Sequence, residues 1–191
     1  MNKIWLWAGL LVPCMLLANE AEIEQAISEG TQAYQEGQLS QAASQFDYVA
    51  TLIRQQQAEA LGSLFPEPLP GWKAKKVASQ GVSATFFGGG INASRNYHKG
   101  SASLEISITK DSPLLQAMAV LFSNANMASM AGYKVKRING HTTMFKQDDN
   151  SLELHMLIAS NILIQLNGSG LSETDLYAYA EALDIDAISK R

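Results

Sequence analysis

The chain has 191 residues, a formal net charge of −4 at pH 7 and a single cysteine. This length suffices for one domain with a real core, or for one domain with a small helical appendage. The mild acidity and the scattered basic residues argue against nucleic-acid binding, because binding to phosphates depends on clustered Lys and Arg.

Residues 1–18 predict a cleavable secretory signal peptide. Lys3 gives a positive start, the segment 4–17 is apolar and uncharged, and Ala18 is a small residue before an acidic stretch. The apolar run is shorter than the roughly 20 residues of a membrane span. We therefore expect cleavage after Ala18, export, and no stable membrane span in the mature chain. A lipoprotein signal built on Cys14 is the alternative, although Pro13 precedes that cysteine and fits such a signal poorly.

Residues 19–63 predict two amphipathic helices joined by a tight turn. Gly37 suits the left-handed position that ends the first helix. Apolar and small residues recur at helical spacing on both sides of it: Ile23, Ala26, Ile27, Gly30 and Tyr34, then Leu39, Ala42, Ala43, Phe46, Val49, Ala50 and Ile53. Two helices joined this closely pack as an antiparallel hairpin.

The hairpin resembles a single tetratricopeptide unit. The resemblance rests on the spacing of Gly30, Gly37, Leu39, Ala42 and Phe46. Repeats of this kind bury their faces by stacking, and at least about three are needed for stability. The resemblance therefore implies that this one unit packs on the rest of the chain, on a second copy or on a partner.

Residues 64–71 predict an extended linker. Pro66, Pro68 and Pro70 stand at alternate positions, which excludes a helix and the interior of a sheet. A proline-rich segment of this kind acts as a semi-rigid spacer. The second unit is then expected over residues 72–191.

Residues 72–191 change to the two-residue period of strands. The clearest alternation covers 104–109, 152–158 and 162–167, and weaker strands are expected near 72–79, 82–87, 91–98, 133–138 and 141–147. The short turns at 148–150 and 160–161 are rich in Asp, Asn and Ser. Turns this short predict antiparallel neighbours.

Two helices are expected within this second unit. One begins at Ser112-Pro113 and runs over 113–131, and the other begins at Ser172. Asp184 and Asp186 flank Ile185 and indicate a strand-like tail. The predicted fold class is α+β: an N-terminal antiparallel helical hairpin followed by an antiparallel β-sheet with helices packed on one face.

Most of the mature chain resembles a family of small exported bacterial proteins. The segments that carry this resemblance are Leu69-Pro70-Gly71-Trp72, Phe87-Gly88-Gly89-Gly90, Leu104-Glu105-Ile106-Ser107-Ile108, Asp111-Ser112-Pro113 and Gly168-Ser169-Gly170-Leu171-Ser172. The family has no assigned activity, so the resemblance implies a periplasmic location and no catalytic residues. The order of elements is also similar to that of the PsbP/Mog1-type sandwich, whose members are mostly binding or assembly factors. That second likeness bears on the fold, which does not by itself imply a function.

The sequence shows no catalytic signature, and we expect no enzyme, no cofactor and no metal. Glu153 and His155 would share a strand face, so His98 or His141 would have to join them to form a metal site. None of the three histidines forms an HxxxH or HExxH pair. The methionines of the helix at 113–131 could bind Cu(I), but an otherwise apolar helix favours core packing for them.

The helix at 113–131 is the most informative feature, because no charged residue occurs from Ser112 to Tyr133. Such a helix is either buried or meets a lipid or a partner. We expect a non-enzymatic envelope accessory or interaction protein with a protein partner and an open oligomeric state. The alternative is a carrier of a small apolar ligand or lipid. The expected interaction surface consists of Tyr34, Phe46, Leu115, Met118 and Phe122.

Overall fold

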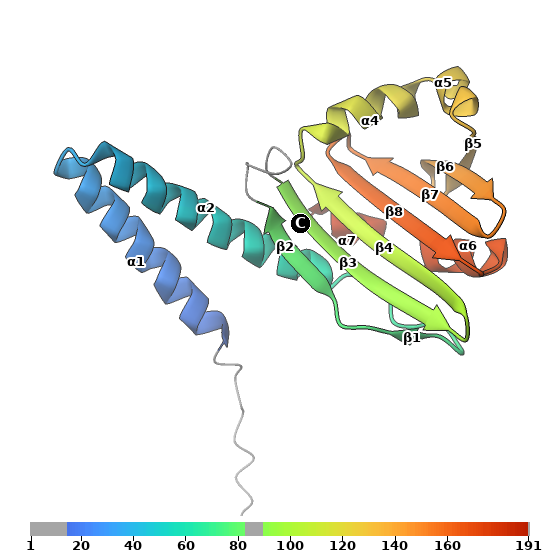
Figure 1. The fold of residues 1–191 in the computed structure, drawn as a ribbon, viewed down its shortest axis with the longest axis horizontal. Helices are drawn as coiled ribbons and strands as arrows, with labels where there is room; N and C mark the ends of the chain where they lie inside the picture. Colours follow the sequence, from blue (N-terminus) through green and yellow to red (C-terminus); the bar gives the residue numbers. More distant parts are fainter. Residues whose placement is uncertain (1–14, 83–89, 191) are drawn as a thin grey trace, which may run out of the picture. The chain divides into compact units, whose positions relative to one another are not determined.

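The computed structural model describes residues 15–82 and 90–190, and its elements form an α+β protein (Figure 1). Contacts divide the chain into two compact units that meet between Leu52 and Ile53, and each unit is described by itself. Three expected features lie largely or wholly outside the described residues: the segment 1–14 of the signal peptide, most of the strand near 82–87, and the pair Gly88-Gly89.

The first unit is the expected helical hairpin, formed by α1 (Met15–Gln35) and the first part of α2 (Leu39–Gly62). Gly37 ends α1 with a φ of 76°, and the amide of Gln38 donates to the carbonyl of Ala33 at 2.8 Å. This is the hydrogen bond of a Schellman cap, which needs a residue without a side chain at the glycine position. The seam between the helices is built from small buried residues: Ala26, Gly30, Ala33 and Ala42.

The second unit is an antiparallel sheet of eight strands, which confirms the predicted fold class. The strands are β1 (Lys73–Ala74), β2 (Ala78–Val82), β3 (Gly90–Lys99), β4 (Ala102–Lys110), β5 (Lys134–Ile138), β6 (His141–Asp148), β7 (Ser151–Ile158) and β8 (Ile162–Ser169). Their order is β1-β3-β4-β8-β7-β6-β5, with β2 also paired to β3. The β4–β8 pair joins the two halves of the sheet, with Ile108 opposite Ile164 and Ile106 opposite Leu166.

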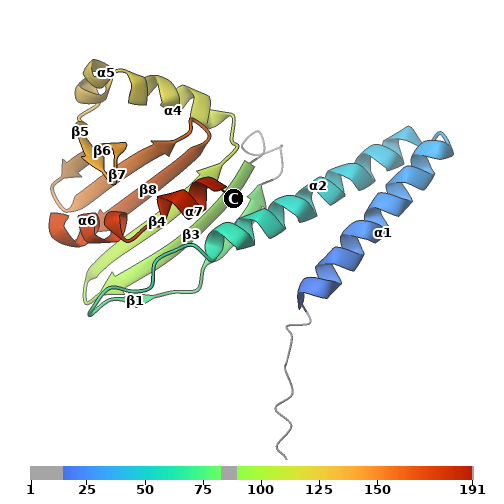
Figure 2. The ribbon, with the colours of Figure 1, turned by 180° about the vertical axis from the view of Figure 1, so that it is seen from behind.

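One face of the sheet carries the main core. Ile106, Ile108 and Ile164 are fully buried on it, because alternate residues of each strand point to the same side. Two C-terminal helices, α6 (Glu173–Glu181) and α7 (Ile185–Lys190), cover this face (Figure 2). Ala58 and Leu61, from the last turns of α2, belong to the same core.

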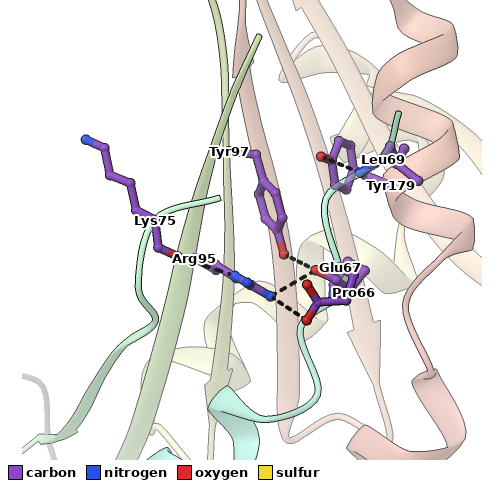
Figure 3. Close-up of polar contacts among 7 residues, drawn as sticks. All are labelled: Pro66, Glu67, Leu69, Lys75, Arg95, Tyr97 and Tyr179. Carbon is purple, nitrogen blue, oxygen red and sulfur yellow. Dashed lines mark hydrogen bonds and ion pairs between the residues drawn. The ribbon is translucent and has the colours of Figure 1, made fainter. Parts of the chain in front are cut away.

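The proline-rich segment at 64–71 is bound to the second unit (Figure 3). Phe65 is buried, and the carbonyl of Pro66 accepts hydrogen bonds from the Tyr97 hydroxyl at 2.7 Å and from Arg95 Nη1 at 3.1 Å. Burial raises the pKa of Tyr97 to about 12, so its hydroxyl stays a donor at neutral pH. The amide of Leu69 donates to the hydroxyl oxygen of Tyr179 at 3.2 Å. These bonds satisfy backbone groups that the prolines leave without a helix or sheet partner.

The single helix expected at 113–131 is wrong, because the chain breaks it into α4 (Leu114–Ser123) and α5 (Ala125–Met130). Asn124 lies between them in an extended conformation, and its side-chain oxygen accepts from the amides of Asn126 and Met127 at 3.0 and 3.2 Å. Asparagine caps a new helix in this way and so competes with continuation of the old one. The α4–α5 pair lies on the side of the sheet opposite α6 and α7 (Figures 1 and 2).

The strand-like tail expected around Ile185 is also wrong, because residues 185–190 form α7. The carboxylate of Asp184 accepts from the amide of Ala187 at 2.9 Å and so caps the helix. Ile185 and Ile188 are both buried, three residues apart on one side of this short helix. The alternation of Asp and Ile therefore marked a helix start, and the spacing of the two isoleucines decided the structure.

Candidate interaction surfaces

One side of the hairpin exposes large apolar side chains, and we call this group the hairpin face. It consists of Ile27 and Tyr34 on α1 and Leu39 and Phe46 on α2, which are 42%, 64%, 63% and 43% exposed. The members on each helix are seven residues apart, which places them on one side of it. A β-carbon on Gly30 would lie 3.1 Å from the Phe46 ring, so this ring rests on α1. The two helices thus form one continuous apolar strip.

The other side of the hairpin is acidic and rich in amides. Glu22, Glu29 and Glu36 follow one another at seven-residue spacing along α1. Glu29 accepts from Gln25 at 2.8 Å and from Gln45 of α2 at 3.1 Å. These donors are neutral and leave the carboxylate charge uncompensated. A shallow cleft of about 470 Å³ follows this side and is lined mainly by polar residues.

The Tyr48 hydroxyl joins the same acidic side by donating a hydrogen bond to Glu22. This bond to a carboxylate raises the pKa of Tyr48, because ionising the phenol would place two negative charges together. Every donor to Glu22, Glu29 or Glu36 within the described part of the hairpin is therefore an amide or a phenol.

Charge is distributed very unevenly over the first unit. Between residues 15 and 52 the sequence contains no Lys, Arg or His, whereas its acidic residues are Glu20, Glu22, Glu24, Glu29, Glu36 and Asp47. Charges of one sign without counter-charges produce a potential that extends beyond contact distance and steers partners of opposite sign. The hairpin is therefore suited to a partner surface that is both apolar and basic.

The second unit exposes a surface of the opposite character, which we call the domain patch. It consists of Met127 and Met130 on α5 with Lys134, Val135 and Arg137 on β5. Met127, Met130 and Val135 are 44%, 90% and 46% exposed. No ion pair involves Lys134 or Arg137 within the described ranges. No Asp or Glu occurs from Ser112 to Gln147, so the local sequence supplies no counter-charge.

The five residues expected to form the interaction surface fall into two groups. Tyr34 and Phe46 are exposed members of the hairpin face in the first unit. Leu115 is only 3% exposed, and Met118 and Phe122 are half-buried, all three on α4 in the second unit. An uncharged helix gives no sign of which side faces water, so the sequence could not separate Leu115 from exposed residues. Met127 and Met130 were assigned to core packing, yet both side chains are exposed.

A buried histidine lies on the sheet face that α4 and α5 adjoin. His155 is 6% exposed, its ring lies 5.5 Å from the ring of Tyr133, and Gln165 Nε2 lies 3.5 Å from its Nε2. Burial lowers the pKa of His155, and the nearby Glu153 opposes this only in part. Tyr133 donates a hydrogen bond to Glu153 at 3.1 Å. Among the residues that the structure describes, no three His, Cys, Asp or Glu side chains converge on one point.

We expect His155 to make the protein less stable as the pH falls below about 6.5, the pKa of an unperturbed histidine. The unfolded chain then binds a proton that the folded chain resists, so acid favours unfolding until the pH drops below the lowered folded pKa. Urea unfolding at pH 7.5, 6.5 and 5.5 measures this, with the pH values chosen around that pKa. His155→Gln should lose less stability over the same interval than the parent. Equal losses in the two proteins would show that His155 is not the group responsible.

No protein-family model, curated protein or solved structure matches this chain. The surfaces must therefore be interpreted from their own chemistry. Over the ranges 15–82 and 90–190, no helix combines the length and the apolar character needed to cross a bilayer.

Proposed function

We propose that the chain is an exported periplasmic protein without enzymatic activity, which works as an accessory or assembly factor by contacting a protein partner in the cell envelope. The observation that carries this proposal is the hairpin face. Aromatic side chains exposed in the centre of an apolar strip, such as Tyr34 and Phe46, are the residue types that anchor interfaces. The N-terminal signal in the sequence supports the location.

A lone hairpin of this kind also has a reason to seek a partner. Its internal seam is made of alanine and glycine, so the helices approach closely but bury little apolar area between them. The large side chains that would supply such burial are turned outward instead. In stacked repeats the next repeat covers such a strip. A partner that covered the hairpin face would fill that role here.

The alternative of a lipid or apolar-ligand carrier has less support. A carrier needs an apolar cavity, and such sites are usually preformed. In the described part of the second unit, the space between the sheet and α6 is filled by stacked rings: Tyr179 lies 4.6 Å from Tyr97 and 5.4 Å from Trp72. A cleft of about 240 Å³ beside α7 is lined mainly by polar residues. These observations favour contact at a surface over storage of a ligand.

Site-specific photo-crosslinking in living cells tests the proposed function. A photoreactive amino acid placed at Tyr34 or Leu39 should give discrete adducts of higher mass in the periplasmic fraction. The matched control is the same amino acid at Gln32 or Gln41, which are exposed on the acidic side of the same helices. The control positions should give few adducts or none, because they lie away from the apolar strip.

Two results of that experiment would contradict the proposal. Recovery of the chain at full length in the cytoplasm would exclude the exported location. Equal labelling of the hairpin face and the acidic side would mean that the apolar strip is not a preferred contact surface. Adducts are identified by mass spectrometry, which names the partner directly.

A further inference from the structure

We propose that the partner covering the hairpin face is the domain patch of a second copy of this chain. This inference rests on the proposed function and names the partner. It brings together the two unpartnered apolar surfaces of the described chain, one acidic and one basic. The following arguments use only their charge, exposure and chemistry.

Charge complementarity selects this pairing. The hairpin carries Glu24 and Asp47 near its apolar strip and has no cation between residues 15 and 52. The domain patch carries Lys134 and Arg137, for which the described chain provides no ion-pair partner. Its other neighbouring cations are already engaged, since Lys136 pairs with Glu173 at 3.8 Å and Lys146 with Asp148 at 2.8 Å. Juxtaposed opposite potentials speed association and fix its register.

The same charges oppose the other ways in which two copies could meet. Two hairpin faces brought together would place acidic surfaces against each other, and two domain patches would do the same with basic surfaces. Like charges across an interface are unfavourable and suppress wrong pairings. Only the contact between a hairpin face and a domain patch removes both uncompensated charges at once.

The apolar components also fit one another. Tyr34 and Phe46 present flat aromatic rings, while Met127 and Met130 present flexible thioethers. Methionine adapts to the shape of a partner and makes favourable contacts between sulfur and aromatic rings. The Met130 side chain is 90% exposed, which no contact within the described chain explains.

The basic residues of β5 have a simpler explanation that covers only part of the observations. β5 is an edge strand, and lysine on an edge prevents uncontrolled pairing with other sheets. This accounts for Lys134, but it does not account for two exposed methionines on the neighbouring helix. A docking surface accounts for both features.

If each hairpin of a pair binds the patch of the other copy, the two contacts are identical and the assembly closes as a two-fold dimer. Sedimentation velocity of the protein purified from the periplasm should show a concentration-dependent dimer. Raising the salt from about 50 mM to 500 mM should weaken it, because exposed charges are screened. A monomer at every concentration tested would overturn the proposal.

Charge reversal provides the decisive test. One variant carries Glu24→Lys with Asp47→Lys in the hairpin, and the other carries Lys134→Glu with Arg137→Glu in the domain patch. Each variant alone should associate at least about tenfold more weakly, because its two surfaces now carry charges of the same sign. An equimolar mixture should recover a heterodimer, because every hairpin–patch contact between unlike copies again joins opposite charges.

A matched control separates this effect from net charge. Lys73→Glu with Lys76→Glu makes the same change of charge at exposed residues next to β1, on the other edge of the sheet. It should leave the dimer unchanged, and circular dichroism should show that all variants are folded. Loss of the dimer in this control, or no recovery in the mixture, would overturn the proposal.

The in-cell crosslinks distinguish failure of this inference from failure of the proposed function. Adducts from Tyr34 that contain only this chain, with the second site mapped to α5 or β5, are expected. Adducts with a different protein would overturn the inference while leaving the proposed function in place. The absence of any adduct from the hairpin face would count against both.

Discussion

Tyr179→Ala is expected to lower the free energy of unfolding by about 3–5 kcal/mol, the range found when large buried aromatic residues are truncated. Tyr179 is fully buried in α6, with its ring against those of Tyr97 and Trp72. Alanine would leave a cavity at the point where the helix, the sheet and the proline-rich segment meet. It would also remove the oxygen that accepts the amide of Leu69.

Urea unfolding followed by circular dichroism measures this loss as a lower midpoint with an unchanged slope. Tyr179→Phe is the control, because it keeps the ring and removes only the hydroxyl. We expect it to cost about 1 kcal/mol, the effect of leaving one partly buried amide without its acceptor. Similar losses in the two variants would show that the hydrogen bond, and not ring packing, dominates at this position.

Phe46→Ala is expected to have the opposite profile, with a small effect on stability and a large effect on association. Its ring is 43% exposed at the centre of the hairpin face, so folding gains only part of its burial. At an interface, an aromatic anchor of this kind contributes at least about 2 kcal/mol, or roughly thirtyfold in affinity. The yield of crosslinks from Leu39 should therefore fall sharply while the urea midpoint changes little.

Tyr48→Ala is the matched control for Phe46→Ala. Tyr48 is also aromatic, belongs to the same helix and is 45% exposed, but it lies on the acidic side. It should leave the crosslink yield at the parental value. Equal losses of crosslinking in the two variants would mean that the hairpin responds to any loss of aromatic surface, and the hairpin face would have no special role.

Local patterns in the sequence were sufficient for the elements whose period is regular. The two-residue alternation of Leu104, Ile106 and Ile108 located β4, and the helical spacing around Gly37 located the hairpin. The break at Asn124 was missed because the apolar pattern continues across it. A capping hydrogen bond there outweighs the pattern, and that choice depends on which residues the new helix can cover.

The candidate surfaces were less accessible from the sequence. Tyr34 and Phe46 share the spacing of Ala26 and Ala42, so periodicity alone could not say which residues face the seam and which face water. Side-chain size decides it, because only small residues fit between helices this close. For α4 and α5, the lack of charge removed the usual indicator of the exposed side, and Leu115 and Met130 could not be told apart.

The position of β8 in the sheet has a consequence for how the chain acquires its structure. β8 is nearly the last strand to be synthesised, yet it lies between β4 and β7 and pairs with both. A chain that leaves the ribosome or crosses a membrane amino end first therefore carries two incomplete half-sheets until residues 162–169 emerge. Each half then has an open edge with unsatisfied backbone groups. Completion is delayed to the end of transit, and a chain cut short before Ile162 would leave no half-sized folded remnant.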